Sequence, residues 1–203
     1  AETCVDSVTL DELFRLAGRD RREFFETLAQ RRMTYGAIFG ADELKTAISG
    51  LYRSVGTEEI ITTHGAAGAN HLALYSLVEP GDAVVSVMPT YQQLYSIPES
   101  YGAKVRILKL KKEENFLPNL DRLRTLVNEK TKIICINNPN NPTGALIPEE
   151  TLRGIVEIAR GVGAYVLCDE VYRFLTQEDG YPESIADLYE KGIAVGSMSK
   201  VFS

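Results

Sequence analysis

Lys200 is the residue of this sequence best suited to covalent chemistry, and it ends the segment Gly196-Ser197-Met198-Ser199-Lys200. One amine stands there beside two hydroxyl groups, after the apolar run that ends at Val195. A lysine that is removed from water loses its proton more readily and can then form a Schiff base with a carbonyl compound. A single lysine is more often a solvated surface residue, so the expectation depends on what lies near it.

A second reactive segment, Asp169-Glu170-Val171-Tyr172, follows the apolar run that ends at Cys168. A carboxylate that leaves a buried strand needs a partner, and a protonated ring nitrogen would serve as one. The alternative is that Asp169 caps the N-terminus of a helix, which is a common use of aspartate. Tyr172 adds a phenol three positions further on.

Three more loops with chemical potential follow apolar runs, at residues 64–69, 88–91 and 137–144. In the first, small residues open a helix whose N–H groups could bind a phosphate, although a tight turn without a ligand would look the same. In the second, Tyr91 follows a rigid proline and could meet a planar ligand or pack at the edge of the core. The third loop contains Asn141 in a dense run of turn-forming residues, which a plain connection also explains.

Short apolar runs that alternate with helical patterns predict the elements that position these loops. Strands are expected at residues 60–63, 83–87, 105–110, 132–136, 164–168 and 193–195. Helical segments are expected at residues 68–77, around Leu94, and at 120–127 and 148–162. This order predicts an α/β fold with a mainly parallel sheet that is covered by helices on both faces. Ligands of such sheets bind beyond the carboxyl ends of the strands, so the five loops should meet at one edge.

The first part of the chain has a different pattern, and residues 1–55 are expected to form an N-terminal arm. Helices are predicted at residues 10–16, 21–32 and 41–54, with a glycine-punctuated loop at 35–40. Residues 56–203 are then expected to form the α/β domain.

Composition excludes several classes of protein. The 203 residues carry a formal net charge of −6, which argues against a nucleic-acid partner. No apolar run approaches the roughly 20 residues that span a bilayer, and no signal peptide is recognisable, so we expect neither a membrane partner nor export. Cys4, Cys135 and Cys168 lack metal-ligand spacing, which predicts no metal site and fits a reducing cytoplasm.

Taken together, the motifs resemble those of the class I and II aminotransferases, which are pyridoxal-phosphate enzymes of fold type I. The resemblance spans roughly residues 33–203. The motifs that carry it are Tyr35 to Gly40, the Gly65 loop, Pro89-Thr90-Tyr91, Asn141-Pro142-Thr143-Gly144, Asp169-Glu170-Val171-Tyr172 and Ser197-Met198-Ser199-Lys200. It implies a three-layer α/β/α large domain that binds pyridoxal 5'-phosphate.

The resemblance assigns roles to the residues that match these motifs. Lys200 matches the lysine that binds the cofactor and later serves as the base of the 1,3-proton shift. Asp169 matches the carboxylate that keeps the pyridine nitrogen protonated. Asn141 and Tyr172 match the pair that hydrogen-bonds the phenolic oxygen of the cofactor, and Tyr91 matches the aromatic side chain stacked on its ring.

The resemblance also implies a phosphate site and a partner. Gly65 with the backbone of Ala66 and Ala67, together with the Ser197 hydroxyl, matches the phosphate cradle. Tyr35 matches a tyrosine that reaches the cofactor phosphate of a neighbouring subunit, which implies a homodimer with shared sites.

The activity expected from the resemblance is transfer of an amino group between an amino acid and a 2-oxo acid. Alternatives on the same scaffold are a β-eliminating lyase, a decarboxylase, a cyclase or an oxidase. A non-catalytic aminotransferase-like binding domain is a further alternative, against which the complete set of cofactor-binding residues speaks. His64 is either a second acid or base or a packing residue. Glu2 and Asp6 either meet a cationic substrate or are solvated.

Two departures from the family pattern bear on these expectations. The glycine-containing segment that commonly covers the substrate is not recognisable in residues 1–6. Such enzymes also continue past the lysine with a phosphate-binding arginine, a further strand and a small domain that anchors the substrate carboxylate. We therefore expect this chain to be a fragment of a protein about twice as long, lacking the C-terminal small domain, and inactive by itself.

Overall fold

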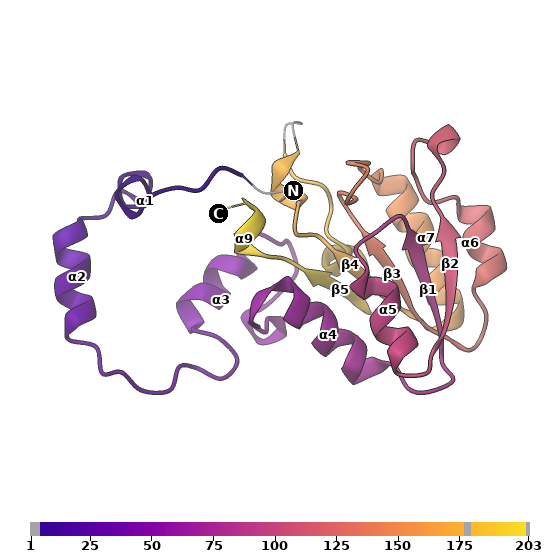
Figure 1. The fold of residues 1–203 in the computed structure, drawn as a ribbon, viewed down its shortest axis with the longest axis horizontal. Coiled ribbons are helices and arrows are strands. Elements are labelled where there is room, and N and C mark those ends of the chain that lie inside the picture. The colour runs from indigo at the N-terminus through magenta and orange to yellow at the C-terminus, as the bar shows by residue number, and fades with distance from the viewer. Residues whose placement is uncertain (1–4, 177–179, 202–203) are drawn as a thin grey trace.

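The computed structural model describes residues 5–176 and 180–201, and its centre is a parallel sheet of five strands (Figure 1). The strands are β1 (Ala83–Met88), β2 (Lys104–Lys109), β3 (Thr131–Asn137), β4 (Tyr165–Asp169) and β5 (Gly192–Val195). Their order is β2-β1-β3-β4-β5, and every neighbouring pair is parallel. The predicted α/β class and parallel sheet are confirmed.

Two hydrophobic cores lie on opposite faces of the sheet because successive side chains of a strand alternate between the faces. In β3, Ile133 and Cys135 pack in the core that contains Leu74 and Leu94. These two leucines belong to α4 (Gly65–Leu77) and α5 (Gln93–Ser100). Ile134 and Ile136 pack in the opposite core, under α6 (Leu120–Leu126), α7 (Glu149–Val162) and α8 (Ile185–Leu188). The molecule therefore has the three layers that were expected.

Local signals explain where the helices begin and end. The side chain of Asn119 accepts a hydrogen bond from the N–H of Arg122 and so caps α6. α7 begins after Pro148 and is followed by the cap residue Gly163, whose φ of 72° is left-handed and favours glycine. Single turns complete the elements: η1 (Thr57–Glu59), η2 (Lys112–Glu114), η3 (Arg173–Leu175) and α9 (Met198–Val201).

The N-terminal helices are α1 (Leu10–Ala17), α2 (Arg21–Ala29) and α3 (Asp42–Ser49). Figure 1 shows α1 and α2 well to one side of the sheet, joined to it by extended segments. Phe14 packs edge-to-face against Phe24 and Phe25, with ring centroids 5.2 and 5.9 Å apart. The three predicted helices are present, although α2 and α3 end earlier than predicted.

The prediction of a strand at residues 60–63 is wrong. These residues pair with no strand in the described part of the chain, and Ile61 is exposed. The N–H of Thr62 donates instead to the carbonyl of Phe39. The helix that follows also begins earlier than predicted, at Gly65 rather than Gly68. A β-branched apolar run is therefore not sufficient for a strand, because a strand also needs a neighbour with which to hydrogen-bond.

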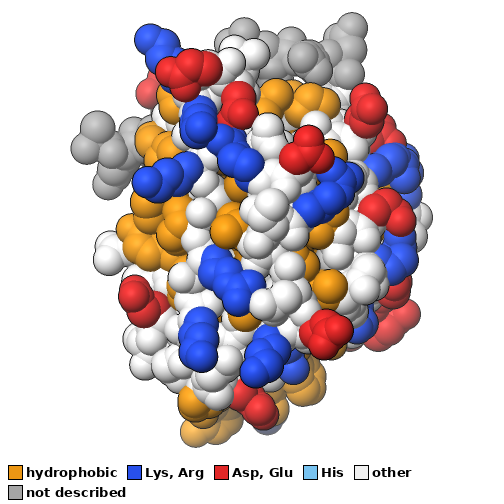
Figure 2. Space-filling view, turned by 90° about the vertical axis from the view of Figure 1, so that its right-hand side faces the viewer, with side chains coloured by type: hydrophobic (Ala, Val, Ile, Leu, Met, Phe, Trp, Pro, Cys, Tyr) orange, Lys and Arg blue, Asp and Glu red, His pale blue; other side chains and the backbone are white. Residues whose placement is uncertain are grey.

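The two cysteines in the described part of the chain, Cys135 and Cys168, are buried as small apolar residues. Burial raises the pKa of the Cys135 thiol to about 12. Among the described residues, no helix is long and apolar enough to cross a membrane. Figure 2 views the end of the molecule where β2 and α6 lie, and basic and acidic side chains are interspersed on that face.

Candidate active site

The carboxyl ends of β3, β4 and β5 bring the predicted loops together. Asn137 lies opposite Asp169 in the β3–β4 ladder, and Asp169 lies opposite Val195 in the β4–β5 ladder. The loops that carry Asn141, Tyr172 and Lys200 therefore leave the sheet from the same edge. This edge is where ligands of open parallel sheets bind.

Asp169 is buried at the end of β4. Leu167 packs toward α4, so the alternation along the strand directs the Asp169 side chain to the same face. Its Oδ2 accepts a hydrogen bond of 3.0 Å from Nδ2 of Asn70 on α4, and its Oδ1 accepts one of 3.3 Å from the N–H of Val171. Burial raises the pKa of Asp169, whereas these two donors and the positive charge of Lys200 oppose that rise. A buried carboxylate within electrostatic reach of the lysine is a suitable acceptor for a cationic ring N–H.

Asn141 and Tyr172 lie side by side, as their predicted shared role requires. Nδ2 of Asn141 is 3.4 Å from the Tyr172 hydroxyl. The backbone of Asn141 is held because its N–H donates to Oδ1 of Asn137, at 2.6 Å. Nδ2 of Asn137 in turn donates to the carbonyl of Asp169, at 2.7 Å. One buried amide at the end of β3 therefore sets the position of Asn141 relative to β4.

The remaining asparagines of this loop have structural contacts. Oδ1 of Asn138 accepts the N–H of Ile147, at 2.8 Å. Nδ2 of Asn140 donates to the carbonyl of Pro89, at 3.1 Å, which joins the loop after β3 to the loop after β1. The density of turn-forming residues noted in the sequence thus serves both the site and the packing of the loop.

The N-terminus of α4 offers an anion site. Gly65 adopts a φ of +73°, a conformation that side chains rarely tolerate, and this turn starts the helix. His64 is the N-cap residue but its side chain makes no capping hydrogen bond, and the first N–H groups of an α-helix, here those of Ala66 and Ala67, have no partner within the helix. These donors and the positive end of the helix dipole fit a phosphate. His64 itself is exposed rather than packed in the core.

Ser197 and Lys200 lie on the turn that follows β5. Oγ of Ser197 is 2.7 Å from Oγ of Ser199 and accepts the N–H of Ser199, so the hydroxyls form a local cap. Lys200 is partly buried in α9, and its carbonyl accepts the N–H of Val5, at 3.2 Å. The N-terminal segment therefore passes beside the lysine, where Asp6 is exposed. Glu2 lies outside the described residues.

Two predicted cofactor contacts remain open to solvent. Tyr91 is 46% exposed beyond β1, and Tyr35 is 100% exposed in the segment between α2 and α3. Tyr91 is at the functional edge of the sheet, where a ring could stack on it. Tyr35 is not brought to the other site residues within this chain.

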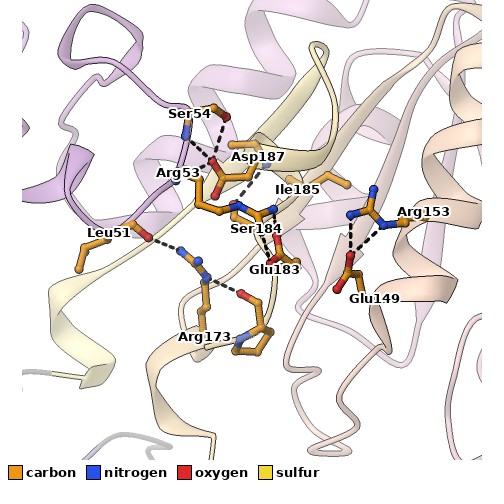
Figure 3. Close-up of polar contacts among 12 residues, drawn as sticks. Leu51, Arg53, Ser54, Glu149, Arg153, Arg173, Glu183, Ser184, Ile185 and Asp187 are labelled. Carbon is orange, nitrogen blue, oxygen red and sulfur yellow. Dashed lines mark hydrogen bonds and ion pairs between the residues drawn. The ribbon is translucent and has the colours of Figure 1, made fainter. Parts of the chain in front are cut away.

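Glu170 and Arg173 form a buried cluster that sequence reasoning did not identify, and Figure 3 shows the contact of Arg173 with Leu51. Oε1 of Glu170 accepts the Ser184 hydroxyl at 3.1 Å and the N–H of Ile185 at 2.8 Å. Nε of Arg173 lies 4.0 Å from Oε2 of Glu170. The sequence signal that could have revealed this cluster is the adjacent pair Asp169-Glu170. Because successive side chains of an extended chain point to opposite faces of a sheet, two neighbouring buried carboxylates need separate partners.

Arg173 also joins three separate segments of the chain. Its guanidinium donates to the carbonyl of Pro182 at 2.8 Å and to the carbonyl of Leu51 at 3.1 Å. Nearby, the N–H groups of Arg53 and Ser54 both donate to Oδ1 of Asp187. These contacts attach the chain before η1 to the segment after β4, and so support the turn that carries Tyr172.

The Glu170 carboxyl predicts a pH-dependent stability. Burial raises the pKa of Glu170 to about 7, although the N–H of Ile185 and the hydroxyl of Ser184 oppose that rise. Because the pKa of Glu170 in the folded protein lies above its ordinary value of 4.5, the stability that Glu170 contributes is present below pH 4.5 and is lost as pH rises through 7. Between pH 4.5 and 7, we expect the free energy of unfolding of the wild type to fall by on the order of 3 kcal/mol relative to that of Glu170→Gln.

Glutamine suits this comparison because its oxygen can keep both bonds that Oε1 accepts. Urea unfolding of the two proteins between pH 4.5 and 7.5 measures the difference. Glu113→Gln, which removes an exposed carboxylate, controls for the loss of one charge. A difference between wild type and Glu170→Gln that does not change with pH would contradict the prediction.

The fold places a helix N-terminus, a lysine and a buried carboxylate beside one edge of a parallel sheet, and this arrangement could hold an anionic cofactor. The family model for aminotransferase class I and II matches residues 11–203. The chain therefore belongs to the class I and II aminotransferase family. The cofactor of this family is pyridoxal 5'-phosphate.

Individual relatives agree with this assignment. The chain is 32% identical over 178 residues to the aspartate aminotransferase of Sulfolobus acidocaldarius, covering 83% of this chain and 44% of that protein. It is similar, with a TM-score of 0.94 and 50% identity, to a PLP-dependent aminotransferase from Streptococcus suis 89-1591, covering 98% of this chain and 53% of that one. An alanine aminotransferase from Pyrococcus furiosus gives a TM-score of 0.79 at 27% identity, covering 88% and 47%. The chain thus spans about half the length of the relatives that it matches.

Proposed function

We propose that the full-length protein is a pyridoxal-phosphate-dependent aminotransferase that moves an amino group between an amino acid and a 2-oxo acid. The observation that carries the proposal is the buried Asp169 carboxylate, which lies within electrostatic reach of Lys200 and beside the strand end that holds Asn141. A buried carboxylate, an amine and an amide–phenol pair at one sheet edge are the donors and acceptors that a pyridine ring with a phenolic oxygen requires.

The chemistry that pyridoxal phosphate supplies when bound is a carbonyl that condenses with amines and a ring that withdraws electrons from the substrate α-carbon. Asp169 would accept a hydrogen bond from a protonated ring nitrogen and would stabilise its positive charge. The amide of Asn141 and the hydroxyl of Tyr172 would hydrogen-bond the phenolic oxygen. Lys200 would hold the cofactor and would serve as the general base at the substrate α-carbon.

The phosphate is assigned to the N-terminus of α4. The N–H groups of Ala66 and Ala67 and the hydroxyl of Ser197 would donate to its oxygens, and the open turn at Gly65 leaves room for them. Tyr91 would stack on the ring. Residues at two separate loops would then hold the cofactor, and such positioning favours reaction at Lys200.

The proposal extends to the organisation of the whole protein. Residues 1–55 act as an arm and residues 56–203 as part of the large, cofactor-binding domain, while a C-terminal small domain supplies the anchor for the substrate carboxylate. Exposed apolar side chains on the arm, among them Met33, Tyr35 and Ile38, favour a homodimer in which Tyr35 reaches the partner's cofactor. Sedimentation equilibrium of the full-length protein tests the dimer, and a monomer at micromolar concentration would contradict it.

The location that we propose for the protein is the cytoplasm. Cys135 and Cys168 are buried and form no disulfide, which is consistent with a reducing compartment.

A half-reaction tests the proposed activity. The full-length protein loaded with pyridoxal phosphate is mixed with single amino acids in the absence of a 2-oxo acid. We expect the visible absorbance of the lysine-bound cofactor to be lost in a stoichiometric step, with one equivalent of 2-oxo acid released. Continuous release of ammonia or of a 2-oxo acid would instead identify a lyase or an oxidase. If no protein-bound visible absorbance forms after cofactor is added, the proposal that the protein is a pyridoxal-phosphate enzyme is rejected.

A further inference from the structure

Asn70 is a polar residue in the apolar stripe by which α4 packs on the sheet. The neighbours that share this face are Ala66, Ala69, Ala73, Leu74 and Leu77, which pack in the core beneath the helix. Asn70 is 0% exposed. An amide that is buried in such surroundings costs free energy unless it forms hydrogen bonds, so its presence calls for a specific partner.

That partner is the Asp169 carboxylate. Nδ2 of Asn70 donates to Oδ2 of Asp169 at 3.0 Å, across the helix–sheet interface and between residues 99 positions apart. The Asp169 carboxylate also accepts a hydrogen bond of 3.3 Å from the N–H of Val171. Asn70 therefore provides the shorter of these two contacts.

The orientation of the Asn70 amide follows from the same contact. Oδ1 of Asn70 is buried and has no hydrogen-bond partner among the described residues. A flipped amide would place this oxygen against the carboxylate, where two acceptors repel each other. The need of Asp169 for a donor thus decides which end of the amide faces it.

The electrostatic effect of Asn70 on Asp169 opposes burial. Burial raises the pKa of Asp169, and the hydrogen bond from Asn70 is the largest influence that lowers it. An amide can donate to a carboxylate but cannot neutralise it by giving up a proton, so it favours the ionised form. Only the ionised form holds a ring nitrogen in its protonated state.

Asn70 also lies five residues after Gly65 on the same helix. At 1.5 Å per residue, roughly 5 to 6 Å of helix separates the N–H groups of Ala66 and Ala67 from the Asn70 backbone. The contact at Asp169 and the anion site at the helix N-terminus are therefore held at a set spacing by one element.

We propose that Asn70 is a positioning residue that keeps the Asp169 carboxylate ionised and oriented toward the cofactor. This inference rests on the proposed function, because it assigns Asp169 to the ring nitrogen. It adds that the electron-withdrawing strength of the bound cofactor depends on a residue of α4 that does not touch the reacting atoms.

The test compares Asn70→Leu with Leu74→Ala in the full-length protein. Asn70→Leu removes the donor and keeps a similar volume, whereas Leu74→Ala damages the packing of α4 one turn away and leaves Asn70 in place. In the cofactor-free protein with ¹³C-labelled aspartate carboxyls, and with Asp169→Asn to assign the signal, we expect Asn70→Leu to raise the pKa of Asp169 by about one unit or more. We expect Leu74→Ala to leave it unchanged.

A second measurement uses the loaded protein. Added pyridoxal phosphate should bind Asn70→Leu about tenfold more weakly, and the pH dependence of its visible absorbance should shift, with kcat lowered more than KM is changed. If Asn70→Leu does not fold, Asn70→Ala gives the same readouts. An unchanged Asp169 pKa and cofactor affinity in a variant that still forms coloured holoenzyme would overturn the inference and leave the proposed function standing. If the wild type forms no holoenzyme, the proposed function fails, and the titration of the cofactor-free protein still decides the coupling.

Discussion

Replacing Lys200 by alanine is expected to lower transaminase turnover of the full-length protein by at least about 10⁴-fold, because one side chain both binds the cofactor and moves the proton at the substrate α-carbon. Lys200 is partly buried on α9, and its charge acts on the Asp169 carboxylate. The loss should therefore appear in kcat and in the covalent attachment of the cofactor together.

Two measurements check the Lys200 prediction. Borohydride reduction of the loaded wild type should attach pyridoxal phosphate covalently to the peptide that contains Lys200, as read by mass spectrometry, and Lys200→Ala should show no such peptide. Lys130→Ala is a suitable control, since Lys130 is exposed beyond the amino end of β1 and β3. A cofactor adduct on another lysine, or turnover that survives in Lys200→Ala, would refute the assignment.

Asp169→Asn is expected to lower kcat by about 10²–10³-fold, the range observed when one preorganised electrostatic contact to a transition state is removed. Asparagine has nearly the shape of aspartate, so the packing on α4 should survive. It lacks the negative charge that stabilises a protonated ring nitrogen. Asp169→Asn should therefore lower kcat while changing the stability of the fold little. The thermal unfolding temperature of the variant without cofactor should stay close to that of the wild type.

Single-turnover absorbance changes with an amino acid substrate measure the Asp169 effect directly. Asp121→Asn, which removes an exposed carboxylate paired with Arg124 on α6, provides the control for loss of one negative charge. A variant at position 169 with wild-type rates would mean that another residue holds the ring nitrogen. Loss of folding in the cofactor-free variant would instead assign Asp169 a structural role.

Most of the fold was predictable from the sequence because local patterns carry it. The runs at 83–87 and 132–136 are short, apolar and separated by helical periodicity, and they became β1 and β3 with one or two residues added. The run at 60–63 has the same local character and forms no strand. Whether an extended run joins a sheet depends on a hydrogen-bonding neighbour, which no local pattern contains.

The sequence by itself predicted which loops lie at one edge of the sheet, because parallel strands joined by helices must place their carboxyl ends there. Lys200, Asp169, Asn141 and Tyr172 were proposed as site residues for that reason. Their supporting contacts were decided only by the tertiary structure: Asn70 meets Asp169 across 99 positions, and Arg173 meets Leu51 across 122. Such pairs are set by how a helix packs on a sheet and by which face of a strand a side chain takes, and neither can be read from spacing along the chain.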